Sequence, residues 1–128
     1  MVGELSGEMT ETMAGNDERM LRCTDRLIDA MEHLRLALEK REGALRAARA
    51  RYDSGNSFSA SLRAAKIAEE RDELNDALFQ LEQRRRESRL AVFRSALDHG
   101  VSINELARMW GFSRQMASRY AKDARREL

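Results

Sequence analysis

The sequence has no proline, one cysteine and few aromatic residues. Because Cys23 is the only cysteine, we expect neither an intramolecular disulfide framework nor a multi-cysteine zinc site. His33 and His99 lie too far apart in the sequence to suggest a metal site. No stretch approaches the roughly 18 consecutive apolar residues that span a bilayer. The chain also does not begin with a basic patch followed by an apolar core, so we expect no secretory signal.

What remains is a charged, mostly helical chain with an uneven charge distribution. The 128 residues have a formal net charge of only +1. Residues 1–18 hold five acids and no base, residues 19–83 hold twelve of each, and residues 84–128 hold eleven bases against five acids. The last third is therefore the cationic part, which can bind a polyanion but can equally be a solvated surface. We expect a cytoplasmic protein without cofactor or metal.

The first residues are rich in Gly, Ser, Thr, Glu and Met without a sustained period. This composition predicts a disordered acidic tail over residues 1–16. Asn16 or Asp17 is expected to cap the helix that follows, with the early acids facing its positive end.

Two stretches with coiled-coil spacing follow, separated by the turn-forming residues 53–57. In both, apolar positions recur in alternating steps of four and three, which is typical of a seam between helices. Ser57 or Ser59 is expected to cap the second helix. The first seam is Met20, Thr24, Leu27, Met31, Leu34, Leu38, Arg41, Leu45 and Ala48. The second is Ala60, Ala64, Ile67, Arg71, Leu74, Leu78, Leu81, Arg85 and Ser88.

The two seams match if the chain folds back at residue 56, since Leu38 then faces Leu74 and Leu34 faces Leu78. We therefore predict an antiparallel helical hairpin, a coiled coil, over residues 17–88. Arg41 would face Arg71, either with stems covering the seam and heads in water, or as a polar layer that sets the register. A two-helix hairpin is marginal alone. The surplus apolar residues Ile28, Leu36 and Phe79 indicate a partner, most simply a second copy forming a four-helix bundle.

Residues 89–128 carry a different pattern, with the signals of several short helices. A stripe of apolar residues over 89–99 ends before Gly100, which suits a left-handed position after a helix. Ser102 and Glu105 have the spacing of a capping box. Gly111 is expected to end the helix that they begin, Phe112 to fill the space between helices, and Ser113 to cap the next one. The expected core residues are Ile103, Leu106, Ala107, Trp110, Met116, Ala117 and Tyr120.

Over residues 101–122 this segment resembles the helix-turn-helix of bacterial and phage transcriptional regulators. The resemblance depends on Ala107 where the helices cross, Gly111 at the turn, and apolar Leu106, Phe112 and Tyr120. It also includes the run Gly-Phe-Ser-Arg-Gln that starts at Gly111. Ala117 departs from the family, which usually has Val or Ile there, so the core is expected to be looser or filled by Trp110.

The resemblance implies that the helix over residues 113–126 enters the major groove of DNA. An Arg side chain can hydrogen-bond to guanine O6 and N7, and a Gln side chain can hydrogen-bond to adenine N6 and N7. A serine at the start of a helix can donate to a phosphate. The implied DNA-binding residues are Ser113, Arg114, Gln115, Ser118, Arg119 and Lys122. Further phosphate contacts are expected from Ser102, Arg85, Arg89, Arg125 and Arg126, although a solvated surface explains the last two equally well.

We therefore expect an all-α, sequence-specific DNA-binding protein, a transcriptional regulator that forms a homodimer through its hairpin. The alternative is a coiled-coil adaptor or antitoxin-like protein that binds a different protein on the hairpin and uses the basic module to localise on nucleic acid. The sequence has no phosphate-binding glycine loop and no nucleophile–base pair, so an enzyme is not expected. Cys23 is interpreted as a helix-packing residue rather than a redox sensor.

Overall fold

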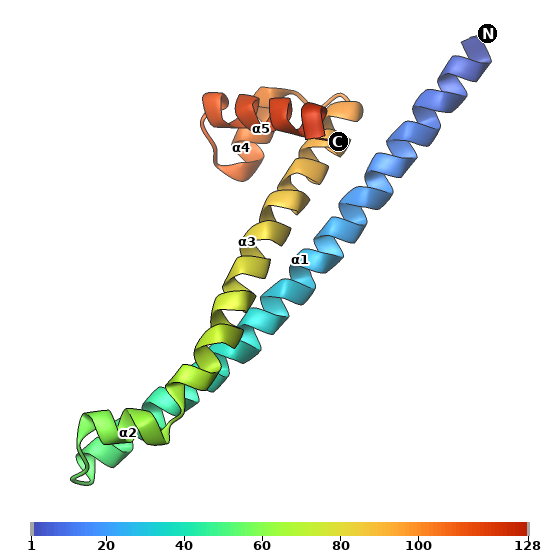
Figure 1. Cartoon of the computed structure of the whole chain (residues 1–128). Coiled ribbons are helices and arrows are strands. Elements are labelled where there is room, and N and C mark those ends of the chain that lie inside the picture. Colours follow the sequence, from blue (N-terminus) through green and yellow to red (C-terminus); the bar gives the residue numbers. More distant parts are fainter. Residues whose placement is uncertain (1, 128) are drawn as a thin grey trace. The chain divides into compact units, whose positions relative to one another are not determined.

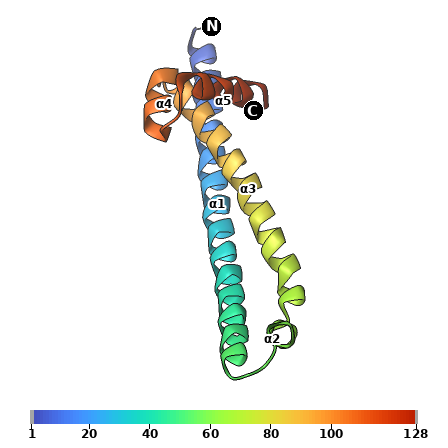
Figure 2. The ribbon, with the colours of Figure 1, turned by 90° about the vertical axis from the view of Figure 1, so that its left-hand side faces the viewer.

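The protein is all-helical in the computed structural model, which describes the backbone of residues 2–127 and the side chains of residues 13–127. In this part of the chain the helices are α1 (Val2–Asp53), α2 (Phe58–Ala64), α3 (Ile67–Asp98), α4 (Ile103–Trp110) and α5 (Arg114–Glu127). Figures 1 and 2 show them from two directions. No helix of the described residues has the length and apolar character needed to cross a membrane.

The chain divides into two compact units. The discontinuous unit consists of Met1–Leu27 and Arg84–Leu128, and the continuous unit consists of Ile28–Gln83. The predicted domains were 17–88 and 89–128, whereas the division between these compact units falls within both long helices. In particular, α3 continues unbroken to Asp98, where the sequence had suggested a new helix from residue 89.

The acidic segment expected to be a disordered tail is helical from Val2 onward, and Met1 lies outside the described residues. Asn16 and Asp17 are interior residues of α1 and not its cap. Within the discontinuous unit they bond to the end of α3: the Asn16 amide donates to Asp98, and the Ser95 hydroxyl donates to Asp17. These contacts give residues 16 and 17 partners that composition alone could not indicate.

In the continuous unit, α1 and α3 contact each other through only half of the predicted seam. Lys40 Nζ lies 3.3 Å from the Glu73 carboxylate, and Arg41 Nη2 lies 3.5 Å from the Ile67 carbonyl oxygen. The larger predicted residues are half-buried, namely Leu34, Ile67, Leu74 and Leu81, as is Leu27 of the other unit. The buried positions between them are alanines: Ala48, which was predicted, and Ala30, Ala37 and Ala77, which the sequence analysis passed over.

Four large residues of the predicted seam are exposed, which corrects the assignment for Met31, Leu38, Leu45 and Leu78. Each directly follows a seam alanine: Ala30, Ala37, Ala44 or Ala77. A seam with steps of three and four residues can pass through either the alanine or the larger residue that follows it. Alanine permits the two helices to approach more closely than leucine does. The two arginines of the predicted Arg41–Arg71 layer also differ in burial: Arg41 is half-buried, whereas Arg71 is exposed.

The second predicted helix is interrupted. Ser57 caps α2 as expected, with its hydroxyl oxygen accepting from the Ala60 amide at 3.2 Å. However, α2 ends at Ala64, and Lys66 takes a left-handed conformation with φ of 55° before α3 begins. No glycine marks this break, which is why the sequence did not reveal it.

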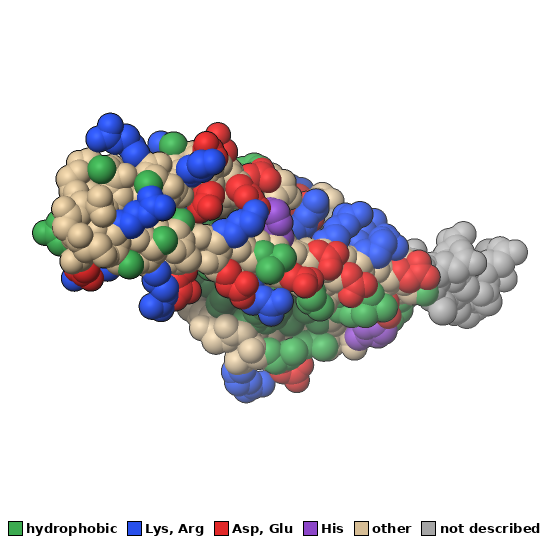
Figure 3. All heavy atoms as spheres, turned by 90° about the horizontal axis from the view of Figure 1, so that it is seen from below, with side chains coloured by type: hydrophobic (Ala, Val, Ile, Leu, Met, Phe, Trp, Pro, Cys, Tyr) green, Lys and Arg blue, Asp and Glu red, His purple; other side chains and the backbone are tan. Residues whose placement is uncertain are grey.

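Figure 3 shows basic, acidic and apolar side chains interspersed over the face that it displays.

Candidate nucleic-acid interface

The candidate interface begins with α4, whose start is fixed by the predicted capping box. The Glu105 amide donates to the Ser102 hydroxyl oxygen at 3.1 Å, and the Ser102 amide donates to the Glu105 carboxylate at 3.2 Å. This reciprocal pair satisfies two amides that the first helical turn leaves without partners. Gly100 precedes the cap with φ of 83°, as its position after a helix predicted.

A three-residue connection, Gly111–Phe112–Ser113, joins α4 to α5. Gly111 has φ of 70°, a left-handed conformation that residues with a side chain adopt at a cost. The Phe112 amide then donates to the Ala107 carbonyl oxygen at 2.8 Å, which closes the end of α4. Ser113 begins α5 by accepting from the Met116 amide at 3.1 Å. Local hydrogen bonds therefore set both the end of α4 and the start of α5.

One face of α5 is buried against α3 and α4. The core of this region consists of Leu90 and Phe93 from α3, Leu106 and Ala107 from α4, and Ala117, Ala121 and Ala124 from α5. The alanines recur at steps of three and four, so they define one face of α5. Small residues on this face let α5 lie close to its neighbours, and Ala117, the departure from the family pattern, is fully buried.

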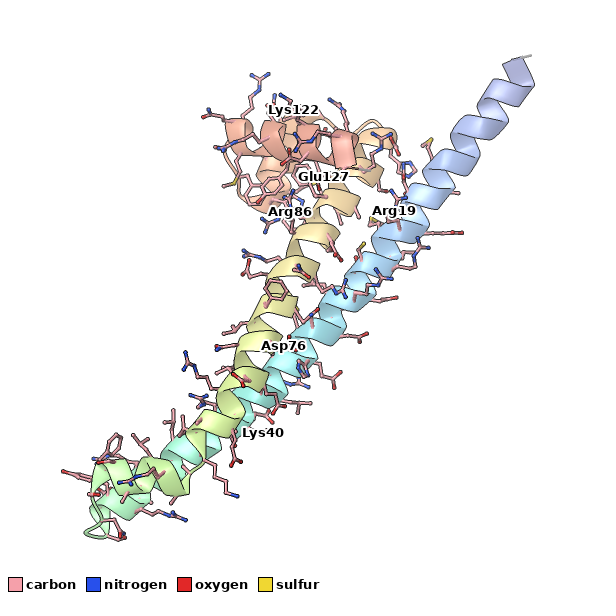
Figure 4. All side chains as sticks on the ribbon, viewed as in Figure 1. Arg19, Lys40, Asp76, Arg86, Lys122 and Glu127 are labelled. Atoms are coloured by element: carbon pink, nitrogen blue, oxygen red, sulfur yellow. The ribbon has the colours of Figure 1, made fainter. Side chains whose placement is uncertain are left out.

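The predicted DNA-binding side chains at the start of α5 and along its outer side are exposed to solvent. All six of them are exposed: Ser113, Arg114, Gln115, Ser118, Arg119 and Lys122. Among the described side chains, Arg114, Arg119 and Lys122 form no ion pair or hydrogen bond, and Arg108 and Arg125 form none either. In Figure 4, Lys122 extends from the side of α5 that faces away from α3. These cations are therefore available to an external anion.

Other cations near α5 already have acidic partners. Arg86 of α3 lies 2.8 Å from Glu127, and the two side chains point toward each other in Figure 4. Arg126 lies 3.1 Å from Asp123. Arg85, another expected phosphate contact, also interacts with the protein itself. These residues are less available for phosphate than Arg114, Arg119 and Lys122.

Arg89, expected as a phosphate contact, instead lies in a cluster of aromatic rings. Its guanidinium carbon is 4.9 Å from the ring centre of Phe112, 5.1 Å from that of Tyr120 and 5.4 Å from that of Trp110. Its Nη1 donates to the Tyr120 hydroxyl at 2.8 Å. Arg89 therefore connects α3 to α4, the turn and α5. The sequence analysis missed this role because the residues involved are widely separated in the chain.

Two predicted core residues are partly exposed. Trp110 and Met116 have 37% and 38% of their surfaces accessible, respectively. Trp110 lies beside the core, with its ring stacked on Phe112 at 6.0 Å and against Phe93 at 6.2 Å. Phe93 occupies the interior in its place, since it is fully buried.

A small pocket of about 210 Å³ lies along α5 and is lined by Arg86, Met116, Arg119, Tyr120 and Asp123. Arg119 therefore lies at the edge of the exposed face, close to an acidic residue of its own helix. Among the described residues, no group of three histidine, cysteine or acidic side chains is placed to hold a metal ion. The chemistry available here is hydrogen bonding and charge pairing from Arg, Lys, Gln and Ser.

Comparison of the chain with models of protein families gives no match, and comparisons with curated proteins and with solved structures give none either.

Proposed function

We propose that α4 and α5 form a helix-turn-helix that binds duplex DNA, with α5 in the major groove. The observation that carries the proposal is the division of α5 into two faces. Its alanine face is buried on Phe93 and Leu106, while its exposed residues include the cations Arg114, Arg119 and Lys122, which have no acidic partners among the described side chains.

The chemistry of this face suits both parts of DNA recognition. Arg114 and Gln115, at the start of α5, have the fork and amide groups that pair with guanine and adenine edges. Ser113 and Ser118 can donate to phosphates, and Lys122 continues the cationic surface along the helix. Arg119 completes the set one turn after Gln115. Such side chains favour sequence-specific binding over purely electrostatic binding.

The proposed protein is a dimeric transcriptional regulator in the cytoplasm, in which the antiparallel α1–α3 pair joins two copies. One module of this size contacts few base pairs, and a twofold dimer doubles that number. The two α5 helices of the dimer would then lie about 34 Å apart, one turn of duplex.

The test begins with selection of binding sites from a random duplex library, followed by fluorescence anisotropy at 50 and 200 mM salt. We expect a sequence preference and an affinity that falls steeply with salt, because phosphate contacts release counterions. Lys122→Ala should weaken binding to all sequences and lower the salt slope by about 1.

Lys40→Ala is the matched control, because Lys40 is an exposed lysine that pairs with Glu73 at 3.3 Å and lies outside the candidate interface. This variant should bind as the unmodified protein does. A chain that selects no sequence, or that loses as much affinity through Lys40→Ala as through Lys122→Ala, would contradict the proposal. Monomeric protein that binds all duplexes alike would favour the adaptor alternative.

A further inference from the structure

In the continuous unit, the paired parts of α1 and α3 have a polar side and an apolar side. The residues directly before the seam positions lie on one side; these seam positions are Leu34, Arg41, Leu74 and Leu81. Lys40 and Glu73 belong to this set, and their 3.3 Å contact shows that these positions meet across the two helices. The set is polar throughout: His33, Lys40, Glu73 and Gln80.

The residues that follow the seam alanines occupy the other side. Met31, Leu38 and Leu45 follow Ala30, Ala37 and Ala44 in α1, and Leu78 follows Ala77 in α3. In an antiparallel pair, the positions after the seam on one helix face the same side as those on the other helix. These four large apolar residues, here called the apolar stripe, are between 44% and 52% exposed. Exposed apolar residues at heptad spacing are typical of a contact with another helix.

A groove of about 790 Å³ continues the apolar stripe toward the turn. Its apolar lining is Leu38, Leu45, Ala50 and Phe58, and its charged lining is Arg41, Glu42, Arg46, Arg49 and Asp53. The charges largely cancel, since Arg46 lies 2.7 Å from Glu42 and Arg49 lies 3.1 Å from Asp53. A groove with paired charges favours neither a polyanion nor a strongly charged protein. It does fit an identical surface, which brings equally paired charges and an equally apolar centre.

We propose that the apolar stripe binds the apolar stripe of a second copy of this chain, so that two α1–α3 pairs form a four-helix bundle. A twofold contact is isologous, with the same patch on both partners, and needs no second surface. This inference identifies the surface through which the two copies of the proposed dimer contact each other. It rests on the proposed function only in that the dimer serves to bind DNA. The seam alanines then serve the contact within one chain, and the apolar stripe serves the contact between chains.

Sedimentation equilibrium of the full chain in the absence of DNA tests this inference. We expect the unmodified protein to have twice the 14.7 kDa mass of one chain. Leu38→Lys and Leu45→Lys should each raise the dissociation constant of the dimer by at least 100-fold, because both copies would bury an ammonium group. Leu36→Lys is the matched control, since Leu36 is a 51% exposed leucine of the same helix that lies outside the apolar stripe; this inference replaces its earlier assignment to the contact with a partner.

Circular dichroism shows whether each variant stays helical, and Leu38→Gln offers a milder change should a lysine variant unfold. Leu38→Gln should also weaken the dimer while Leu36→Gln does not. A monomeric unmodified chain, a Leu38 variant of unchanged mass, or equal dissociation by the Leu36 control would overturn the proposal. Because no DNA is present, failure here leaves the DNA-binding proposal standing, and failure to bind DNA leaves this result unaffected.

Discussion

Arg89 of α3 and Tyr120 of α5 are joined by a hydrogen bond of 2.8 Å while the Arg89 guanidinium lies over the Tyr120 ring. Phe112 stacks on the same ring at 5.4 Å. This arrangement ties the turn and α5 to α3 at one point. The orientation of the candidate recognition helix therefore depends on an arginine that faces into the protein.

Arg89→Met should lower the free energy of unfolding by about 2 kcal/mol. It keeps a long apolar stem but removes the cation–π contacts, worth about 0.5–2 kcal/mol, and a hydrogen bond worth about 1 kcal/mol. Tyr120→Phe, which removes only the hydroxyl, should cost about 1 kcal/mol. Urea unfolding measures both, and a double variant shows whether the two effects overlap. Additive costs would contradict a shared interaction.

Gly111→Ala should destabilise the protein by about 1–2 kcal/mol, because alanine is strained at a φ of 70°. No atom lies within 4 Å of the added Cβ, so backbone strain alone sets the cost. Gly43→Ala is the comparison, since Gly43 lies inside α1 with equally open space. It should stabilise the protein by about 0.5–1 kcal/mol. Thermal unfolding that gave both substitutions the same sign would disprove the left-handed turn.

Asp17 should make stability depend on pH in acid. The hydrogen bond from Ser95, followed by the one from His99, lowers the pKa of Asp17 below its ordinary value of 3.8. The ionised form is thus favoured in the folded state, so the stabilisation is complete above pH 3.8 and is lost as pH falls through the lowered pKa. Asp17→Asn should lower the melting temperature at pH 6 and flatten its decline below pH 4. An unchanged pH profile would contradict the Asp17 contacts.

Arg114→Ala should relax the preference at one base position and cost about 1–3 kcal/mol of binding free energy. Arg114 is exposed and has no acidic partner among the described side chains, so its removal should leave stability nearly unchanged. Repeating the site selection with this variant measures the preference directly. Identical selected sites and affinity would contradict the proposed docking of α5.

The local parts of the fold were predictable because they depend on neighbours in the chain. The capping box of Ser102 and Glu105, the left-handed Gly111 and the cap at Ser57 all follow from residue type and spacing. The place of Asn16 inside α1 was not predictable, since Asn16 obtains its partner, Asp98, from the far end of α3.

The helix seam shows why packing is harder to predict than helix position. A step of three or four residues from Leu34 permits either Ala37 or Leu38, and size alone favours the leucine. The protein buries Ala37 and exposes Leu38, because the contact within the chain is a close one. In the candidate interface the exposure of α5 residues was predictable from its alanine face, whereas the placement of Arg89 required three separate segments to meet.

Photo-crosslinking from single positions tests the central claim, that the outer face of α5 contacts DNA bases. A photoreactive residue replaces Gln115 in one variant and Gln80, a half-buried residue of the continuous unit, in a second. The account predicts crosslinks from position 115 to bases at one place in each half of the selected site, and none from position 80. Equal crosslinking from both positions, or none from position 115 in a protein that binds the site, would contradict it.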